Sequence, residues 1–139
     1  MSETLETRPV PQVETKGGVI AYLAVDGAVK AAELYRKAFA AEIAAQHPVD
    51  DKGRTMHIHL YVNGSSMMLG DFYEEHGHAK VAPAAITLQL IVDDAQAWFD
   101  RAVAAGCEGI MPPQKMFWGD IWGQVRDPFG FVWAFNQAA

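Results

Sequence analysis

The sequence predicts an α+β fold in which two repeated β-α-β-β-β modules form curved mixed sheets around a cleft. Segments with alternating apolar and polar residues are typical of half-buried strands, and two stretches carry apolar residues at helical spacing. The two halves of the chain also match at an offset of about 66 residues. Val25 corresponds to Val92, and the turn at Gly64 corresponds to the turn at Gly130.

The first module is expected over residues 17–72. A strand is predicted over 18–25, followed by a helix in AVKAAELYRKAFA and a weak strand over 42–49. The alternating segment MHIHLYV and the segment SSMMLGD predict a hairpin, because the Asn63-Gly64 pair between them is typical of a tight turn.

The second module is expected over residues 84–137. ITLQLIV predicts a strand, AQAWFDRAVAAG a helix, and EGIMPP a short strand that ends at Pro112 and Pro113. WGQVRD and FVWAF predict the last two strands, with DPFG as the turn between them. Both modules belong to one domain over residues 17–137, and the polar residues 1–16 are expected to be a flexible tail.

Composition limits the classes of partner. The chain has 139 residues, half of them apolar, and a net charge of -6. The negative charge argues against nucleic acid and against an anionic membrane surface. No signal peptide and no apolar run long enough to span a bilayer are visible. Cys107 is the single cysteine, expected to be a buried, inert thiol, and the absence of disulfides fits the cytoplasm.

Three segments carry a resemblance to a known family: AYLAVDGAVKAAELYRKAFAAE, MHIHLYVNGSSMMLGD and FWGDIWGQVRDPFGFVWAF. The last contains an Arg-Asp-Pro-x-Gly turn that leads into an aromatic strand. Over residues 17–137 the chain resembles the vicinal oxygen chelate superfamily, which includes glyoxalase, bleomycin-resistance and extradiol dioxygenase proteins. The Trp-Gly-Asp before the turn is similar to the PhnB-like branch. The resemblance implies a homodimer with small-molecule pockets at or near the subunit contact.

The resemblance also implies where metal-dependent members place their ligands. Those positions fall here on Ile20 or Val19, on Met68 (or Asp71 if the strand is shifted), on Thr87 and on Ala134. Most of these side chains are poor ligands, and a stable site usually needs three or more. We therefore expect no metal cofactor. Tyr22 and Gln89 lie two residues beyond Ile20 and Thr87, so they are expected to face the cleft.

Two histidine pairs are candidate site residues. His57 and His59 share one face of a strand. They are interpreted as a satisfied polar network or a partly exposed face, as lining of a ligand pocket, or as two metal ligands with Asp71 as a third. His76 and His78 lie in a polar loop between the modules, where they are either in solvent or part of a lid over the cleft.

The C-terminal third is rich in aromatic residues. Trp118 and Trp122 are interpreted as core and dimer contact, or as a wall on which a flat or apolar ligand stacks. Asp120 lies in the same loop and is a candidate for orienting a donor group of the ligand. Arg126 is expected to pair with a local carboxylate or cap the turn, with substrate binding as the alternative.

Two functions follow from these residues. The first is a metal-independent homodimer that binds a small molecule, with no enzymatic activity assigned. Its predicted ligand-binding residues are Tyr22, His57, His59, Thr87, Gln89, Trp118, Asp120 and Trp122. The alternative is a lyase, isomerase or dioxygenase-like enzyme that holds a divalent metal at a non-standard site. That site would consist of His57, His59 and Asp71.

Overall fold

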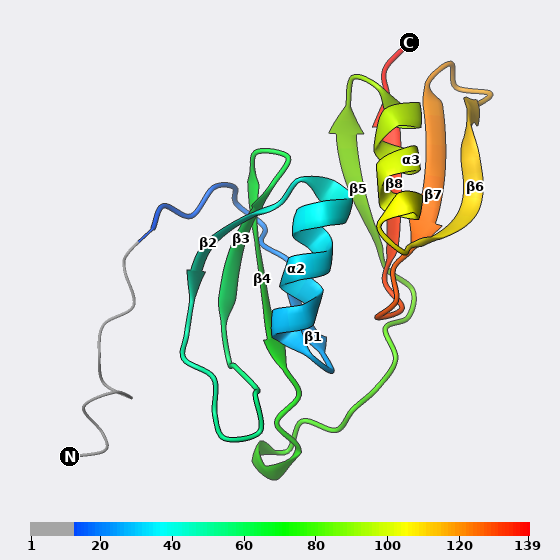
Figure 1. Ribbon diagram of the computed structural model, residues 1–139. Coiled ribbons are helices and arrows are strands. Elements are labelled where there is room, and N and C mark those ends of the chain that lie inside the picture. The colour runs from blue at the N-terminus through cyan, green and yellow to red at the C-terminus, as the bar shows by residue number, and fades with distance from the viewer. Residues whose placement is uncertain (1–12) are drawn as a thin grey trace.

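The first half of the described chain forms a four-stranded sheet with one helix (Figure 1). The computed structural model describes residues 13–139. The elements of this half are β1 (Tyr22–Val25), α2 (Ala28–Phe39), β2 (Glu42–Gln46), β3 (Ile58–Val62) and β4 (Ser65–Asp71). The strand order is β1-β4-β3-β2, in which β1 is parallel to β4 and the other pairs are antiparallel.

The second half repeats this arrangement. After the short 3-10 helix η1 (Glu74–His76) come β5 (Thr87–Val92), α3 (Ala95–Ala104), β6 (Glu108–Lys115), β7 (Ile121–Arg126) and β8 (Val132–Gln137). The sheet order is β5-β8-β7-β6. The strand register repeats as well, since Tyr22 pairs with Met68 and Gln89 pairs with Ala134. The predicted α+β fold with two repeated modules is confirmed.

The last strand of each module ends beside the start of that module's helix. Asp71 Oδ1 accepts hydrogen bonds from the backbone N–H groups of Gly27 (2.8 Å) and Ala28 (3.1 Å). At the same place in the second module, Gln137 Oε1 accepts from the N–H of Ala95 (2.9 Å). The first N–H groups of a helix have no partner within it, so these side chains satisfy donors that the helices leave open.

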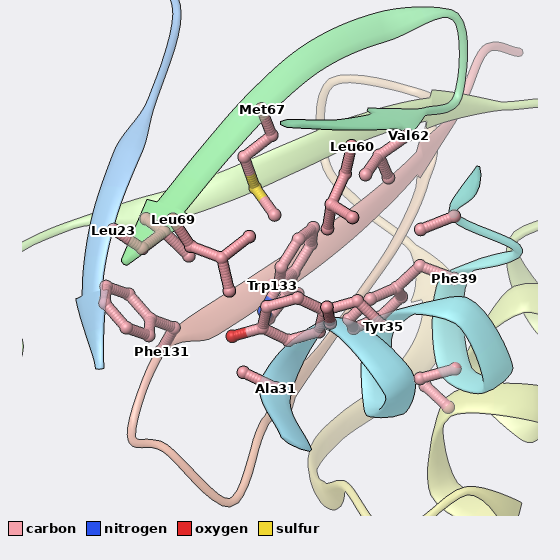
Figure 2. Close-up of a cluster of buried hydrophobic side chains, with 14 of the residues drawn as sticks. Leu23, Ala31, Tyr35, Phe39, Leu60, Val62, Met67, Leu69, Phe131 and Trp133 are labelled. Atoms are coloured by element: carbon pink, nitrogen blue, oxygen red, sulfur yellow. The ribbon is translucent and has the colours of Figure 1, made fainter. Parts of the chain in front are cut away.

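The core lies between the two sheets and is shared by both modules. Tyr35 and Phe39 of α2 pack on Trp133 of β8, and the rings of Phe39 and Trp133 stack with centroids 4.0 Å apart. Leu60 and Leu69 of the first sheet point toward the same cluster (Figure 2). Because this packing covers the inner face of each sheet, the outer faces are the surfaces left for ligands.

The Asp-Pro-Phe-Gly turn between β7 and β8 is tied to α2 by a buried carboxylate. Asp127 Oδ2 accepts from the hydroxyl of Tyr35 (2.6 Å) and from Nε1 of Trp133 (2.9 Å). Its neighbour Arg126 pairs with Glu108 (3.6 Å), which confirms the expected local carboxylate partner. The turn motif therefore supports the junction between the modules.

One local expectation needs correction. β6 does not end at Pro112 and Pro113 but continues to Lys115. It is an edge strand with register shifts, so the prolines, which have no N–H, can occupy positions that need no hydrogen bond to a neighbouring strand. Lys16, the last residue of the predicted tail, is bonded to β4: its N–H donates to Ser66 Oγ (2.8 Å) and its carbonyl oxygen accepts from Ser66 N–H (2.9 Å). Residues 1–12 of that tail lie outside the described part of the chain.

Two further observations bear on the sequence-based expectations. Cys107 is buried, as expected for an inert thiol, and burial raises its pKa to about 12. None of the helices between residues 13 and 139 is long and apolar enough to cross a membrane.

Candidate functional site

The outer face of the first sheet carries a row of side chains that the register places side by side. Tyr22 of β1 pairs with Met68 of β4, which in turn pairs with His59 of β3. Side chains at alternate strand positions share a face, so His57 lies on this face as well. The structure therefore brings together three of the predicted site residues, Tyr22, His57 and His59.

A hydrogen-bonded pair of Tyr22 and His57 lies at the edge of this face. The Tyr22 hydroxyl lies 2.6 Å from the carbonyl oxygen of Met56 and 3.0 Å from Nδ1 of His57. The single hydroxyl hydrogen is donated to Met56, so the hydroxyl oxygen accepts from Nδ1–H of His57. This tautomer leaves the lone pair of His57 Nε2 available as an acceptor.

Both members of the pair are uncharged near neutral pH. Partial burial lowers the pKa of His57 below its usual 6.5, and the nearby His47 and His59 lower it further. Partial burial also raises the pKa of the Tyr22 hydroxyl above its usual 10.0. The pair thus presents neutral hydrogen-bonding groups, which suits a polar but uncharged part of a ligand.

His59 has a different role from His57. It is only 3% exposed, and its Nε2 lies 2.7 Å from Ser66 Oγ. Ser66 Oγ already accepts from the N–H of Lys16, so its hydrogen can be donated to His59. Of the three interpretations of the histidine pair, this geometry matches a satisfied polar network for His59.

Asp71 does not lie with the histidines. Its carboxylate accepts from the N–H groups of Gly27, Ala28 and Thr55, on the helix side of the sheet. The cause is the alternation of the strand, which turns Asp71 away from the face that holds His59. Within residues 13–139 no group of three or more His, Cys, Asp or Glu side chains is arranged to hold a metal ion. The combination of His57, His59 and Asp71 is therefore not assembled.

The outer face of the second sheet carries most of the other predicted residues. Gln89 and Thr87 occupy alternate positions of β5, and both are exposed. Trp122 Nε1 donates to Gln89 Oε1 (3.0 Å), so the amide NH₂ of Gln89 points to other partners. Trp118 meets Trp122 edge-on with ring centroids 6.3 Å apart. The neighbouring Phe117 is 96% exposed.

Asp120 holds the C-terminal end of the chain in place. Its carboxylate accepts from Asn136 Nδ2 (3.0 Å) and from the N–H of Ala139 (3.0 Å). These bonds, with Asn136 as the larger cause, hold the pKa of Asp120 below its usual range. Asp120 therefore fixes the loop that carries Trp118, and its direct role toward a ligand stays a prediction.

The pairs Tyr22–His57 and Gln89–Trp122 occupy equivalent positions in the two modules. Tyr22 and Gln89 are the first residues of matching cross-strand rows, Tyr22–Met68–His59 and Gln89–Ala134–Gln124. In each row the next outward-facing residue of the third strand, His57 or Trp122, bonds back to the first. The alternation pattern placed Tyr22 and Gln89 on the faces that point away from the core, and their expected place at a cleft stays a prediction. Their bonds depend on tertiary contacts.

Sequence reasoning missed part of the surroundings of Tyr22. A cavity of about 470 Å³ adjoins Tyr22 and is lined also by Met56, Tyr73, His76 and His78. Neither Met56 nor Tyr73 was a candidate, because the sequence pattern gives no sign that either residue lies beside Tyr22. His76 and His78 are both exposed, as the solvent alternative expects, and because they also line this cavity a lid stays a prediction.

Residues 17–135 match the sequence profile of the Glyoxalase/Bleomycin resistance protein/Dioxygenase superfamily. The chain belongs to this superfamily. It is 35% identical over 122 residues to an uncharacterised protein of Mycobacterium bovis, which covers 84% of this chain and 80% of that protein.

Two solved structures share the superfamily fold. TioX from Micromonospora sp. ML1 superposes with a TM-score of 0.70 at 23% identity, covering 88% of this chain and 99% of TioX. A PhnB protein from Bacillus cereus superposes with a TM-score of 0.67 at 20% identity, covering 88% of this chain and all of that one.

The positions that the superfamily resemblance implied for metal ligands do not fit a metal here. Thr87, Ala134 and Met68 lie on the outer faces, and of these three side chains only that of Thr87 carries an oxygen. A divalent ion of this kind is usually held by His, Cys, Asp or Glu side chains. The chemistry of these outer faces is therefore that of neutral hydrogen bonding and aromatic contact.

Proposed function

We propose that this chain is a metal-independent small-molecule-binding protein that acts as a homodimer, with ligand sites on the outer faces of its two sheets. The observation that carries the proposal is the recurrence of one neutral pair on each face, Tyr22–His57 and Gln89–Trp122. Each pair satisfies one group internally and leaves another, His57 Nε2 or the Gln89 amide NH₂, free to bond a ligand.

The homodimer is supported by the apolar surface on these faces. Tyr22 is 55% exposed, and Ile91 and Trp118 are also large exposed side chains on or beside the outer faces. A partner subunit that covers them would exclude water from the polar pairs and strengthen their bonds to a ligand. Placement in the PhnB-like branch and in the cytoplasm completes the proposal, supported by the likeness to the Bacillus cereus protein and by the single buried thiol.

The geometry favours binding over a divalent-metal lyase, isomerase or dioxygenase. That alternative required Asp71 beside the histidines, and the Asp71 carboxylate is instead bonded to three backbone N–H groups. Moving it would leave those donors unpaired in a partly buried region, which is costly.

A thermal-shift screen of a compound library, combined with light scattering, tests the proposal. We expect a dimer, and we expect hits that still stabilise the protein when a chelator is present. The affinity for these hits should fall about tenfold in Gln89→Ala or Tyr22→Phe. Gln96→Ala is the matched control, because Gln96 bonds only to Asp100 on the surface of α3. Stabilisation that needs a divalent ion, or that ignores both outer-face changes, would contradict the proposal.

A further inference from the structure

The segment Tyr73–His78 supplies three of the residues that line the cavity of about 470 Å³ beside Tyr22. Tyr22 and Ala24 of β1 and Met56 line it together with Tyr73, His76 and His78 of this segment. We propose that this cavity binds an uncharged aromatic molecule and that Tyr73–His78 is a lid fastened by Arg54. The inference rests on the proposed function, and it assigns a ligand class and an access route to one part of the first outer face.

The lining determines the class of ligand. Asp71 carries the one carboxylate among the residues that line the cavity, and three N–H groups already occupy it; neither Lys nor Arg is among these lining residues. A charged ligand would therefore lose its hydration without gaining a Lys, an Arg or an unoccupied carboxylate as a partner. Tyr22, Tyr73 and the thioether of Met56 favour the faces and edges of an aromatic ring.

Among the described residues, one side chain makes the hydrogen bonds that join the lid to other segments. Its backbone bonds are internal, from His76 and His78 N–H to Tyr73 O and from Gly77 N–H to Glu74 O. Within residues 13–139, the hydrogen bonds that link it to other segments all come from Arg54. The guanidinium donates to Glu75 through Nη1 (3.0 Å) and Nη2 (2.7 Å), and it lies 4.3 Å from the ring centre of Tyr73.

Arg54 is itself held in position before it reaches the lid. Its Nε donates to Asp50 Oδ2 (2.9 Å), and Asp50 also accepts from the backbone N–H of Arg54 (2.8 Å). A planar guanidinium fixed at one end presents its other two nitrogens to a carboxylate in a bidentate arrangement. The bond to Arg54 lowers the pKa of Glu75 to about 2, so both partners stay charged from mildly acid to alkaline pH.

Opening of the lid therefore requires the Arg54–Glu75 pair to separate. Loss of either partner should speed both entry and exit of a ligand, because the closed state loses its one polar attachment. The affinity should change less than the rates, because neither side chain lines the cavity.

The test uses two fluorescent probes with the same naphthylamine core. N-phenyl-1-naphthylamine is uncharged, and 1-anilinonaphthalene-8-sulfonate is anionic. We expect saturable binding of the uncharged probe, with nuclear Overhauser contacts to the Met56 methyl group, and binding of the anionic probe at least about tenfold weaker. Ala24→Phe, which puts a large ring at an exposed position in the lining, should abolish the contacts to Met56.

The lid is tested by stopped-flow release of the uncharged probe and by hydrogen exchange of residues 73–78. Arg54→Gln and Glu75→Gln should each raise the release rate about tenfold and speed exchange in this segment. Glu75→Gln leaves the Arg54–Asp50 bonds intact, so it isolates the lid contact. Arg36→Gln is the matched control, because it breaks the exposed Arg36–Glu33 pair on α2.

Several results would overturn the inference. They are absence of probe contacts with Met56, equal affinity for the two probes, or lid exchange unchanged in both Arg54→Gln and Glu75→Gln. The wild-type contacts need no variant, so the cavity is tested even if Ala24→Phe does not fold. Library hits that still depend on Gln89 would then leave the proposed function standing, whereas loss of all hits would remove both.

Discussion

Asp127 is a buried carboxylate, 3% exposed, that joins three parts of the fold. It accepts from the Tyr35 hydroxyl, from Trp133 Nε1 and from the N–H groups of Phe129 and Phe131. Burial, and then Asp127 itself, raises the pKa of Tyr35, so the phenol stays a donor. The part of the sequence that most closely resembles the superfamily thus has a structural role.

Asp127→Ala should lower the free energy of unfolding by about 3 kcal/mol, because it leaves the buried Tyr35 and Trp133 donors without a partner. Asp26→Ala serves as the control, since its exposed pair with Lys80 is expected to contribute less than about 1 kcal/mol. Urea denaturation measures both. Equal losses in the two variants would contradict the assigned role of Asp127.

His57 gives the fold a pH dependence of known sign. Its pKa is lowered in the folded state, first by burial and then by His47 and His59, so the unfolded chain takes up a proton at higher pH. The stability that the neutral His57 contributes is fully present above its usual pKa of 6.5. It is lost as the pH falls from 6.5 toward the lowered pKa of His57 in the folded protein. His57→Gln should reduce the difference in unfolding free energy between pH 7.5 and pH 5.5. An unchanged difference would contradict the neutral state assigned to His57.

At the scale of elements, the two modules use different side chains to bond the open N–H groups at the start of their helices. Asp71 and Gln137 each end a last strand and bond to the start of a helix. A carboxylate is the stronger partner there, because the N-terminus of a helix carries partial positive charge. Asp71 also bonds to Thr55, which positions the segment that contains Arg54.

Asp71→Ala should therefore cost about 2 kcal/mol of unfolding free energy, and Gln137→Ala about 1 kcal/mol. The order of the two losses is the prediction, and guanidinium denaturation of both variants checks it. A larger loss in Gln137→Ala would show that the charge on Asp71 does not stabilise α2.

Local sequence patterns predicted the hairpin turn and the alternation of the strands, because both depend on neighbouring residues. Asn63 and Gly64 have the positive φ values, 49° and 84°, that their hairpin turn requires. Alternation also placed Tyr22 and Gln89 on outward faces. The continuation of β6 through Pro112 and Pro113 was not predictable in this way, because it depends on the strand being at the edge of its sheet.

The candidate site depends on contacts between distant segments, so less of it could be predicted. The Tyr22–His57 bond joins residues 35 positions apart, and the bond from Arg54 to Glu75 spans 21 positions. Ser66, which bonds to His59, also accepts from Lys16, 50 positions away. A single sequence contains these residues but gives no signal that they meet.

At the scale of the whole molecule, the repeat produces two outer faces with equivalent polar pairs and different surroundings. The first face adjoins the lidded cavity, and the second carries the exposed indole of Trp118 and the ring of Phe117. One shared core fixes both faces in one chain. A homodimer would therefore present two copies of each face, all built on the same packed scaffold.

A crystallographic fragment screen of the full chain, without added divalent ions, tests the central claim most directly. The account predicts that bound fragments gather on the outer faces, with polar atoms on His57 Nε2 or the Gln89 amide and rings against Trp118 or Trp122. Fragments that avoid both outer faces and collect elsewhere, for example beside Gln96 and Pro113, would contradict it.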